Sequence, residues 1–182
     1  MSSYTRLRIP GRRYFFTVCL ADRSSDLLTA RIDELRGAFA TVMMRRPFAI
    51  EAIVVLPDHL HTVIRLPPGD ADFSTRWKEI KCGFTKRIGA DVSRSRSRAR
   101  KGEAGIWQRR FWEHAIRDED DFARHVAYCW GNPVKHGHAV RAVDWPFSSI
   151  HRDIRLGRVD PEWQGPVAAG RFGEMESRLV ER

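Results

Sequence analysis

Residues 48–66 place two β-prone runs in direct succession, FAIEAIVVL and HLHTVIRL, with only Pro57 and Asp58 between them. A proline followed by an aspartate favours a tight turn, so the two runs predict a hairpin of antiparallel strands. One face of such a hairpin can pack on helices. A fold built on a helix-covered sheet is therefore the first expectation for this chain.

The second run carries two histidines, His59 and His61, one residue apart. Because successive side chains of a strand point to opposite faces, both imidazoles share one face and Leu60 points to the other. Two imidazoles on one face can form half of a metal site. Histidines at this spacing also occur in strands without any metal, so the spacing alone leaves both interpretations open.

The other segments predict further strands and helices. Strand-like alternation occupies residues 12–23 and 106–116, and helical spacing occupies residues 29–46, 72–89 and 118–132. Thr29 is a possible helix cap, and the last helix runs into Pro133, with Gly137 following as a natural stop. The order predicts an α+β fold, a ferredoxin-like antiparallel sheet with helices packed on one face. Residues 1–137 would form this domain, and residues 138–182 would form a C-terminal extension with little core of its own.

The charge of the chain is strongly basic. The 182 residues carry 32 Lys and Arg against 23 Asp and Glu, a net charge of +9. Such a field attracts polyanions such as nucleic acid, although a membrane surface or a ribosome would accept it too. The three cysteines form no CxxC pair, and the chain has neither a signal-like start nor a membrane-length apolar run. We expect a cytoplasmic, nucleoid-associated protein without membrane contact.

Tyr128 and Asn132 lie four residues apart in the last predicted helix, which puts their side chains one turn apart on one face. A tyrosine phenol can attack an electrophile that a cation polarises, and the product is a covalent intermediate. Two neutral imidazoles and the amide oxygen of Asn132 would supply three ligands to such a cation. A site of this kind breaks a phosphodiester without an external energy source.

Each of these residues also has an ordinary structural interpretation. Tyr128 fits a position at the edge of the core, and Asn132 can simply end its helix. His136 and His138 repeat the HxH spacing, but they flank a glycine after a proline, where no strand gives them a common face. We therefore assign this second pair to a loop.

Three strings occur together in the chain: VVLPDHLHTVIRLP, GIWQRRFWEHAIRDEDDFARHVAYCWGNPVKHG and DWPFSSIHR. Their conjunction resembles the REP-associated tyrosine transposases, which are relatives of the IS200/IS605 single-strand transposases in the HUH nuclease superfamily. The resemblance runs from about Arg13 to Arg152. Any one of the strings alone would be far less specific.

The resemblance implies roles for four residues. His59 and His61 match the metal-binding pair of the family, Tyr128 the catalytic tyrosine, and Asn132 the polar residue that completes the metal site. It implies cleavage of single-stranded DNA beside a palindromic REP-type hairpin, with a 5′-phosphotyrosine link and a free 3′-OH that can reverse the step. The implied cofactor is Mg2+ or Mn2+, and the protein would act as a monomer or a homodimer.

The chain departs from the family at Gly131, where a larger residue is common between the nucleophile and the third ligand. Glycine destabilises a helix by roughly 1 kcal/mol relative to alanine. A looser last helical turn around Tyr128 is therefore expected.

Basic residues that would contact DNA phosphates come from two segments. The segment SRSRSRARKGEAG is too polar to bury and is either a solvated linker or a phosphate-binding arm. The string WQRRFW adds aromatic residues that could stack on bases, although at least two of Trp107, Phe111 and Trp112 are expected in the core. The predicted DNA-binding residues are Arg94, Arg96, Arg98, Arg100, Lys101, Arg109 and Arg110.

Three functions fit these observations. The leading one is a metal-dependent tyrosine transposase, an endonuclease and strand transferase that acts on single-stranded DNA. The alternative is a domesticated protein that binds DNA hairpins with the same fold but without catalysis. The third is a basic RNA-binding protein of ferredoxin-like shape.

Overall fold

The computed structural model describes residues 7–89, 105–165, 172 and 173. Within them, four antiparallel strands form one sheet in the order β2-β3-β1-β4. The strands are β1 (Arg13–Cys19), β2 (Ala49–Val55), β3 (His59–Arg65) and β4 (Trp112–Ala115). β1 pairs with β3 along its whole length, with Cys19 opposite His59. The predicted hairpin of β2 and β3 is confirmed, and the β1–β3 pair forms the centre of the sheet.

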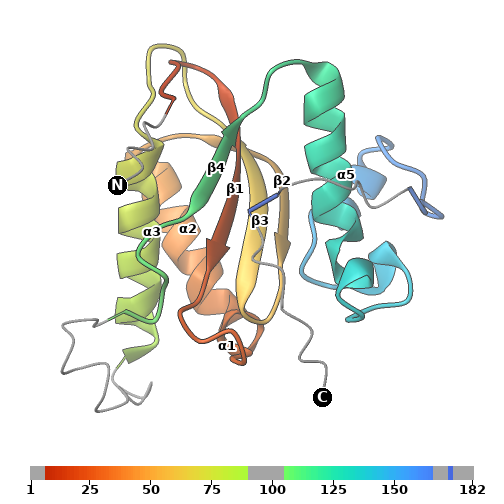
Figure 1. Cartoon of the computed structure of the whole chain (residues 1–182), viewed down its shortest axis with the longest axis horizontal. Helices are drawn as coiled ribbons and strands as arrows, with labels where there is room; N and C mark the ends of the chain where they lie inside the picture. The colour runs from red at the N-terminus through yellow and green to blue at the C-terminus, as the bar shows by residue number, and fades with distance from the viewer. Residues whose placement is uncertain (1–6, 90–104, 166–171, 174–182) are drawn as a thin grey trace, which may run out of the picture.

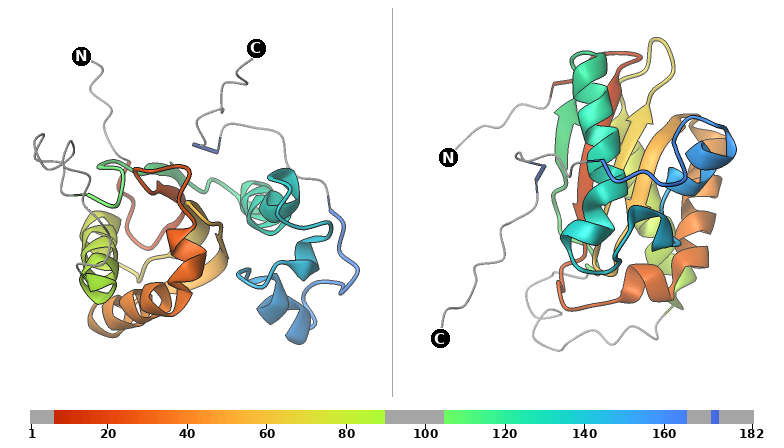
Figure 2. Two further views of the ribbon diagram at one scale, coloured as in Figure 1. Left: turned by 90° about the horizontal axis from the view of Figure 1, so that it is seen from below. Right: turned by 90° about the vertical axis from the view of Figure 1, so that its right-hand side faces the viewer.

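Helices cover both faces of this sheet, as the view from below in Figure 2 shows. They are α1 (Leu27–Ala30), α2 (Ile32–Arg45), α3 (Phe73–Arg87), α5 (Glu119–Lys135) and α6 (Ile150–Arg155), with a short 3-10 helix, η2 (Ala142–Asp144). α2 and α3 pack on the face that carries Phe16 and Leu60. α5 packs on the opposite face, against Phe15 and Val63 (Figure 1). None of the helices in the described ranges is long and apolar enough to cross a membrane.

The predicted α+β class and ferredoxin-like antiparallel sheet are confirmed. The expectation that the helices share one face holds for α2 and α3 and is wrong for α5. The physical reason lies in the two central strands, whose side chains are buried on both faces. A sheet that is apolar on both sides needs a covering layer on each.

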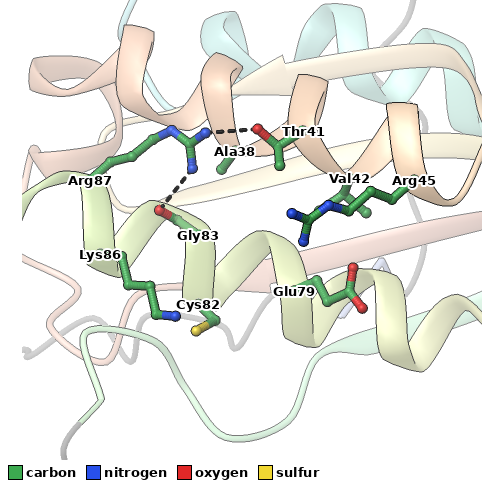
Figure 3. A pocket seen from close by; sticks show the side chains of 9 residues that line it. All are labelled: Ala38, Thr41, Val42, Arg45, Glu79, Cys82, Gly83, Lys86 and Arg87. Atoms are coloured by element: carbon green, nitrogen blue, oxygen red, sulfur yellow. Dashed lines mark hydrogen bonds between the residues drawn. The ribbon is translucent and has the colours of Figure 1, made fainter.

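α2 and α3 lie close together because small residues stand where they meet. A Cβ added at Gly37 or Gly83 would lie only 3.0 or 3.3 Å from the guanidinium group of Arg87. Arg87 donates to Thr41 Oγ1 (2.7 Å) and to the Gly83 carbonyl (3.3 Å), as Figure 3 shows. Arg45 and Arg87 line a groove of about 250 Å³ between the helices. The basic surface of the protein therefore includes this outer helix layer, on the far side of the sheet from α5.

Residues that follow α5 return to the edge of β2. The Ser149 amide donates to the Ile53 carbonyl (2.8 Å), and the Ile53 amide donates to Ser149 Oγ (3.0 Å). Trp145 Nε1 donates to the Val55 carbonyl (2.9 Å). An uncovered edge strand offers its N–H and C=O groups to other chains, so this segment protects β2. The division of the chain at residue 137 stays a prediction.

Two local predictions from the sequence are wrong. Residues 106–116 form a strand only over β4, because Trp107 turns its ring into the core against Phe84 and makes a single bridge to Leu20. Thr29 lies inside α1, where its hydroxyl donates to the Asp26 carbonyl, and it does not cap α2. Both differences arise from tertiary contacts that the local pattern does not contain.

α5 continues past Pro133 and stops at Gly137, the natural stop in the sequence. It passes through Gly131 and Pro133 without a break, and the His136 amide donates to the Asn132 carbonyl (3.1 Å). Gly137, with φ of +70°, then ends the helix in the left-handed conformation that glycine tolerates. The looser last turn predicted from Gly131 does not break the helix.

Replacing Trp77 by alanine tests the core under α2 and α3. The Trp77 side chain is 1% exposed and packs against Phe16, Phe39 and Phe111. Because loss of a buried tryptophan leaves a cavity, we expect the free energy of unfolding to fall by about 3–5 kcal/mol, measured by denaturant titration. Met44→Ala is the control, since Met44 is 79% exposed. An equal loss in both variants would contradict this packing.

Candidate active site

Two buried histidines lie next to each other on the face of the sheet that α5 covers. His59 and His61 are 2% and 0% exposed, and their ring centroids are 4.9 Å apart at nearly a right angle. Leu60, between them, belongs to the core on the opposite face. The shared face predicted from the spacing of the histidines is confirmed.

Each imidazole is held through its Nδ1 atom. His59 Nδ1 donates to Asp58 Oδ1 (2.7 Å), because a carboxylate can only accept. His61 Nδ1 lies 2.8 Å from the hydroxyl of Thr17, its partner across the β1–β3 ladder. That hydroxyl gives its one proton to the Phe172 carbonyl, so it accepts from His61. Both rings are thus oriented in the tautomer whose Nε2 lone pair can bind a metal.

Asp58 is a stable acceptor for His59. Burial alone would raise the pKa of this carboxyl, but the hydrogen bond with His59 and the nearby charge of Arg23 outweigh burial and hold the pKa below its ordinary value. Arg23 Nε lies 2.8 Å from Asp58 Oδ2. The carboxylate therefore stays ionised at neutral pH and keeps the proton of His59 on Nδ1.

α5 carries the predicted nucleophile to the histidine pair. The Tyr128 ring centroid lies 5.1 Å from that of His61, and Tyr128 is 1% exposed. Asn132 follows one turn later on α5 and is 0% exposed. The structure thus brings Tyr128 together with the histidines and buries Asn132 next to it on the helix.

Sequence reasoning missed three neighbours of this group. Lys135 Nζ donates to Tyr128 Oη (2.9 Å), and the Phe172 ring stacks on the Tyr128 ring with centroids 3.7 Å apart. His136, which the sequence assigns to a loop, has its ring centroid 5.3 Å from that of His59. A longer predicted helix would have placed Lys135 two turns after Tyr128. No local pattern signals the contact with Phe172, because it joins distant parts of the chain.

A second group of possible metal ligands lies at the start of α5. Ligand atoms of His114, Asp121 and His125 lie within 4.8 Å of one another. Asp121 Oδ2 accepts hydrogen bonds from His114 Nε2 (2.7 Å) and from the amide and Nε of Arg117 (3.0 and 3.1 Å). Burial opposes ionisation of Asp121, but these donors outweigh it and hold its pKa well below the ordinary value. The guanidinium therefore satisfies the carboxylate without a metal, and the group fastens the first turn of α5 to β4.

The predicted DNA-binding residues fall into two sets. Arg94, Arg96, Arg98, Arg100 and Lys101 lie outside the described residues. Arg109 and Arg110 are described and exposed. Trp107 and Phe111 pack with the core under α2 and α3, and Trp112 packs with the core under α5. The expected core position of these aromatic residues is confirmed, which leaves the two arginines as the exposed part of WQRRFW.

Comparison with known proteins gives a consistent result. No family model matches the chain. A protein of Escherichia coli K12 named REP-associated tyrosine transposase is 47% identical over 174 residues, which cover 96% of this chain and 98% of the relative. A Haemophilus influenzae Rd protein, assigned by its name to the same family, is 42% identical over 166 residues, with 91% and 94% of the two chains covered.

A solved structure has the same fold over nearly the whole chain. It is that of a REP-associated tyrosine transposase bound to a REP hairpin, with a TM-score of 0.84 at 46% identity. The match covers 96% of this chain and 98% of that one. The motifs, the fold and these similarities agree, and the chain belongs to the family of REP-associated tyrosine transposases.

Proposed function

We propose that this protein is a metal-dependent tyrosine transposase that cleaves and rejoins single-stranded DNA beside a palindromic REP-type hairpin. The observation that carries the proposal is the buried contact of Tyr128 with His61, whose imidazole Thr17 orients. The hairpin substrate is supported by the solved relative, which is bound to a REP hairpin. An enzyme with this substrate acts where the chromosome lies, in the cytoplasm and nucleoid.

His59, His61 and Asn132 would hold the metal ion. The Nδ1 contacts of the two histidines fit this role, because metal-binding imidazoles are commonly fixed through the other ring nitrogen. Two imidazole nitrogens and one amide oxygen suit Mn2+ better than Mg2+, which prefers oxygen ligands. A bound divalent ion would polarise the phosphodiester and stabilise the charge that develops on its oxygens.

Tyr128 would act as the nucleophile. Its Oη forms a bond to phosphorus, and the P–O3′ bond breaks, which leaves a 5′-phosphotyrosine and a free 3′-OH. One phosphate ester replaces another, so the 3′-OH of a strand can later attack the phosphotyrosine and rejoin the DNA. Because Tyr128 is 1% exposed, with Phe172 stacked on its ring, residues that cover the tyrosine have to move before a DNA phosphate can reach Oη.

The covered tyrosine also favours one alternative function. Tyr128 is 1% exposed beneath Phe172, and a protein that only binds hairpins could keep the same fold and basic surface with this site closed. Tight hairpin binding by the unmodified chain without cleavage in Mn2+ or Mg2+ would support that alternative.

Tyr128→Phe tests the nucleophile. We expect the covalent adduct with a single-stranded oligonucleotide that contains a hairpin to disappear on a denaturing gel, because phenylalanine lacks the attacking oxygen. Hairpin binding should remain. Tyr14→Phe is the matched control, since the Tyr14 hydroxyl accepts from the Ile9 amide (2.6 Å) and its ring lies in the core under α2 and α3. An adduct that persists in Tyr128→Phe would overturn the assignment.

Removing one histidine from each cluster decides which of them binds the metal. His61→Gln should weaken Mn2+ binding at least about tenfold, since changing even an outer partner of a metal ligand has effects of this size. His114→Gln should leave Mn2+ affinity unchanged, because His114 bonds to Asp121 in the cluster that Arg117 already neutralises. Electron paramagnetic resonance of free Mn2+ measures both affinities. The reverse order of effects would place the metal at the start of α5.

Arg109→Gln combined with Arg110→Gln tests the exposed arginines. If each neutralises one phosphate, the plot of log affinity against log salt should become shallower by about 2. Arg155→Gln, on the exposed side of α6, provides the control and should keep the slope. Fluorescence anisotropy of a labelled hairpin gives the affinities. Equal slopes for the double variant and the unmodified protein would remove these arginines from the DNA-binding surface.

A further inference from the structure

Lys135 directly contacts the atom that would attack the DNA. Its Nζ donates to Tyr128 Oη at 2.9 Å, and both residues belong to α5, where they lie two turns apart. The contact exists because α5 continues through Pro133. The Cα–Cβ bonds of a helix tilt toward its N-terminus, so a long side chain in the last turn reaches back over the preceding turns.

The ammonium group is not needed to hold the tyrosine ring in place. The ring already packs against His61, Phe15 and Phe172, with centroid distances of 5.1, 5.9 and 3.7 Å. Lys135 is itself exposed, and a polar contact of an exposed lysine adds little to stability. The contact therefore has more consequence for the charge on Oη than for the packing of Tyr128.

We propose that Lys135 is a catalytic residue, which orients Tyr128 Oη and stabilises negative charge on it during cleavage and rejoining. This role rests on the proposed function of Tyr128 as the nucleophile. During cleavage the Oη–P bond forms and the P–O3′ bond breaks; the phenol proton passes to solvent, and the 3′ oxygen takes a proton from solvent.

Charge stabilisation matters most in the rejoining direction. There the 3′-OH gives its proton to solvent as its oxygen attacks phosphorus, the Oη–P bond breaks, and Oη leaves with the bonding electron pair before it takes up a proton from solvent. A preorganised donor aimed at an oxygen where charge develops commonly accelerates such a step by about 100-fold or more. The Lys135 ammonium is such a donor and carries a full positive charge.

The test compares three variants of the full chain. Lys135→Met keeps the length of the side chain and removes the donor, Lys135→Arg restores a cationic donor, and Lys86→Met removes a lysine from α3, on the other side of the sheet. Single-turnover adduct formation and rejoining are measured with a saturating hairpin oligonucleotide in Mn2+, and hairpin affinity is measured separately.

We expect Lys135→Met to lower the single-turnover rate constants about 100-fold while hairpin affinity stays unchanged. Lys135→Arg should recover a substantial part of the rate, and Lys86→Met should behave as the unmodified protein does. Unchanged rate constants in Lys135→Met, or a defect that saturating DNA removes, would overturn the role of Lys135. Absence of any adduct with the unmodified protein would instead overturn the proposed function, and with it this role.

A second readout needs neither DNA nor metal. The chain has only three tyrosines, so the Cζ resonance of Tyr128 can be assigned in 13C-labelled protein by comparison with Tyr128→Phe. Lys135→Met should shift this resonance, because the substitution removes a charged hydrogen-bond donor from Oη, whereas Lys86→Met should not. An unshifted resonance in a folded Lys135→Met variant would show that the contact does not form in solution.

Discussion

The antiparallel pairing of β1 with β3 is the interaction on which both halves of the molecule depend. It runs from Arg13 to Cys19 along β1 and buries side chains on both faces of both strands. One face forms the core with α2 and α3, and Tyr128 belongs to the other core cluster. The other face presents His59 and His61, and the same ladder sets the Thr17 hydroxyl against His61. If β1 and β3 buried side chains on one face only, they could not contribute both to the core and to a buried polar site.

α5 completes the site because its first turn is fastened to β4 and its buried face packs on the sheet. The hydrogen bonds of Asp121 with His114 and Arg117 fasten its first turn to β4. Gly137 ends it after Lys135, two turns beyond Tyr128. A helix held in this way keeps Tyr128, the proposed nucleophile, in a defined position relative to the histidines of β3, as an in-line attack on phosphorus would require.

Local patterns predicted the sheet and the face of the histidines because alternation in a strand is set by the backbone alone. Tyr128 and Asn132 were predicted as neighbours for the same kind of reason, the helical repeat. The pattern failed where long-range packing decides: the side of the sheet that α5 covers, the turn of Trp107 into the core, and the stacking of Phe172 on Tyr128. It also left the end of α5 between Pro133 and Gly137, because a proline inside a helix removes a backbone donor and commonly breaks the helix. Lys135 and His136 were therefore not assigned to the site.

The covalent role of Tyr128 is the central claim, and peptide mapping of the DNA adduct tests it most directly. After reaction with a hairpin oligonucleotide in Mn2+, nuclease and trypsin digestion should leave a nucleotide mass on the peptide from His125 to Lys135. Fragmentation in the mass spectrometer should place this mass on Tyr128. A nucleotide on any other residue, or cleaved DNA without a nucleotide-bearing peptide, would contradict the mechanism.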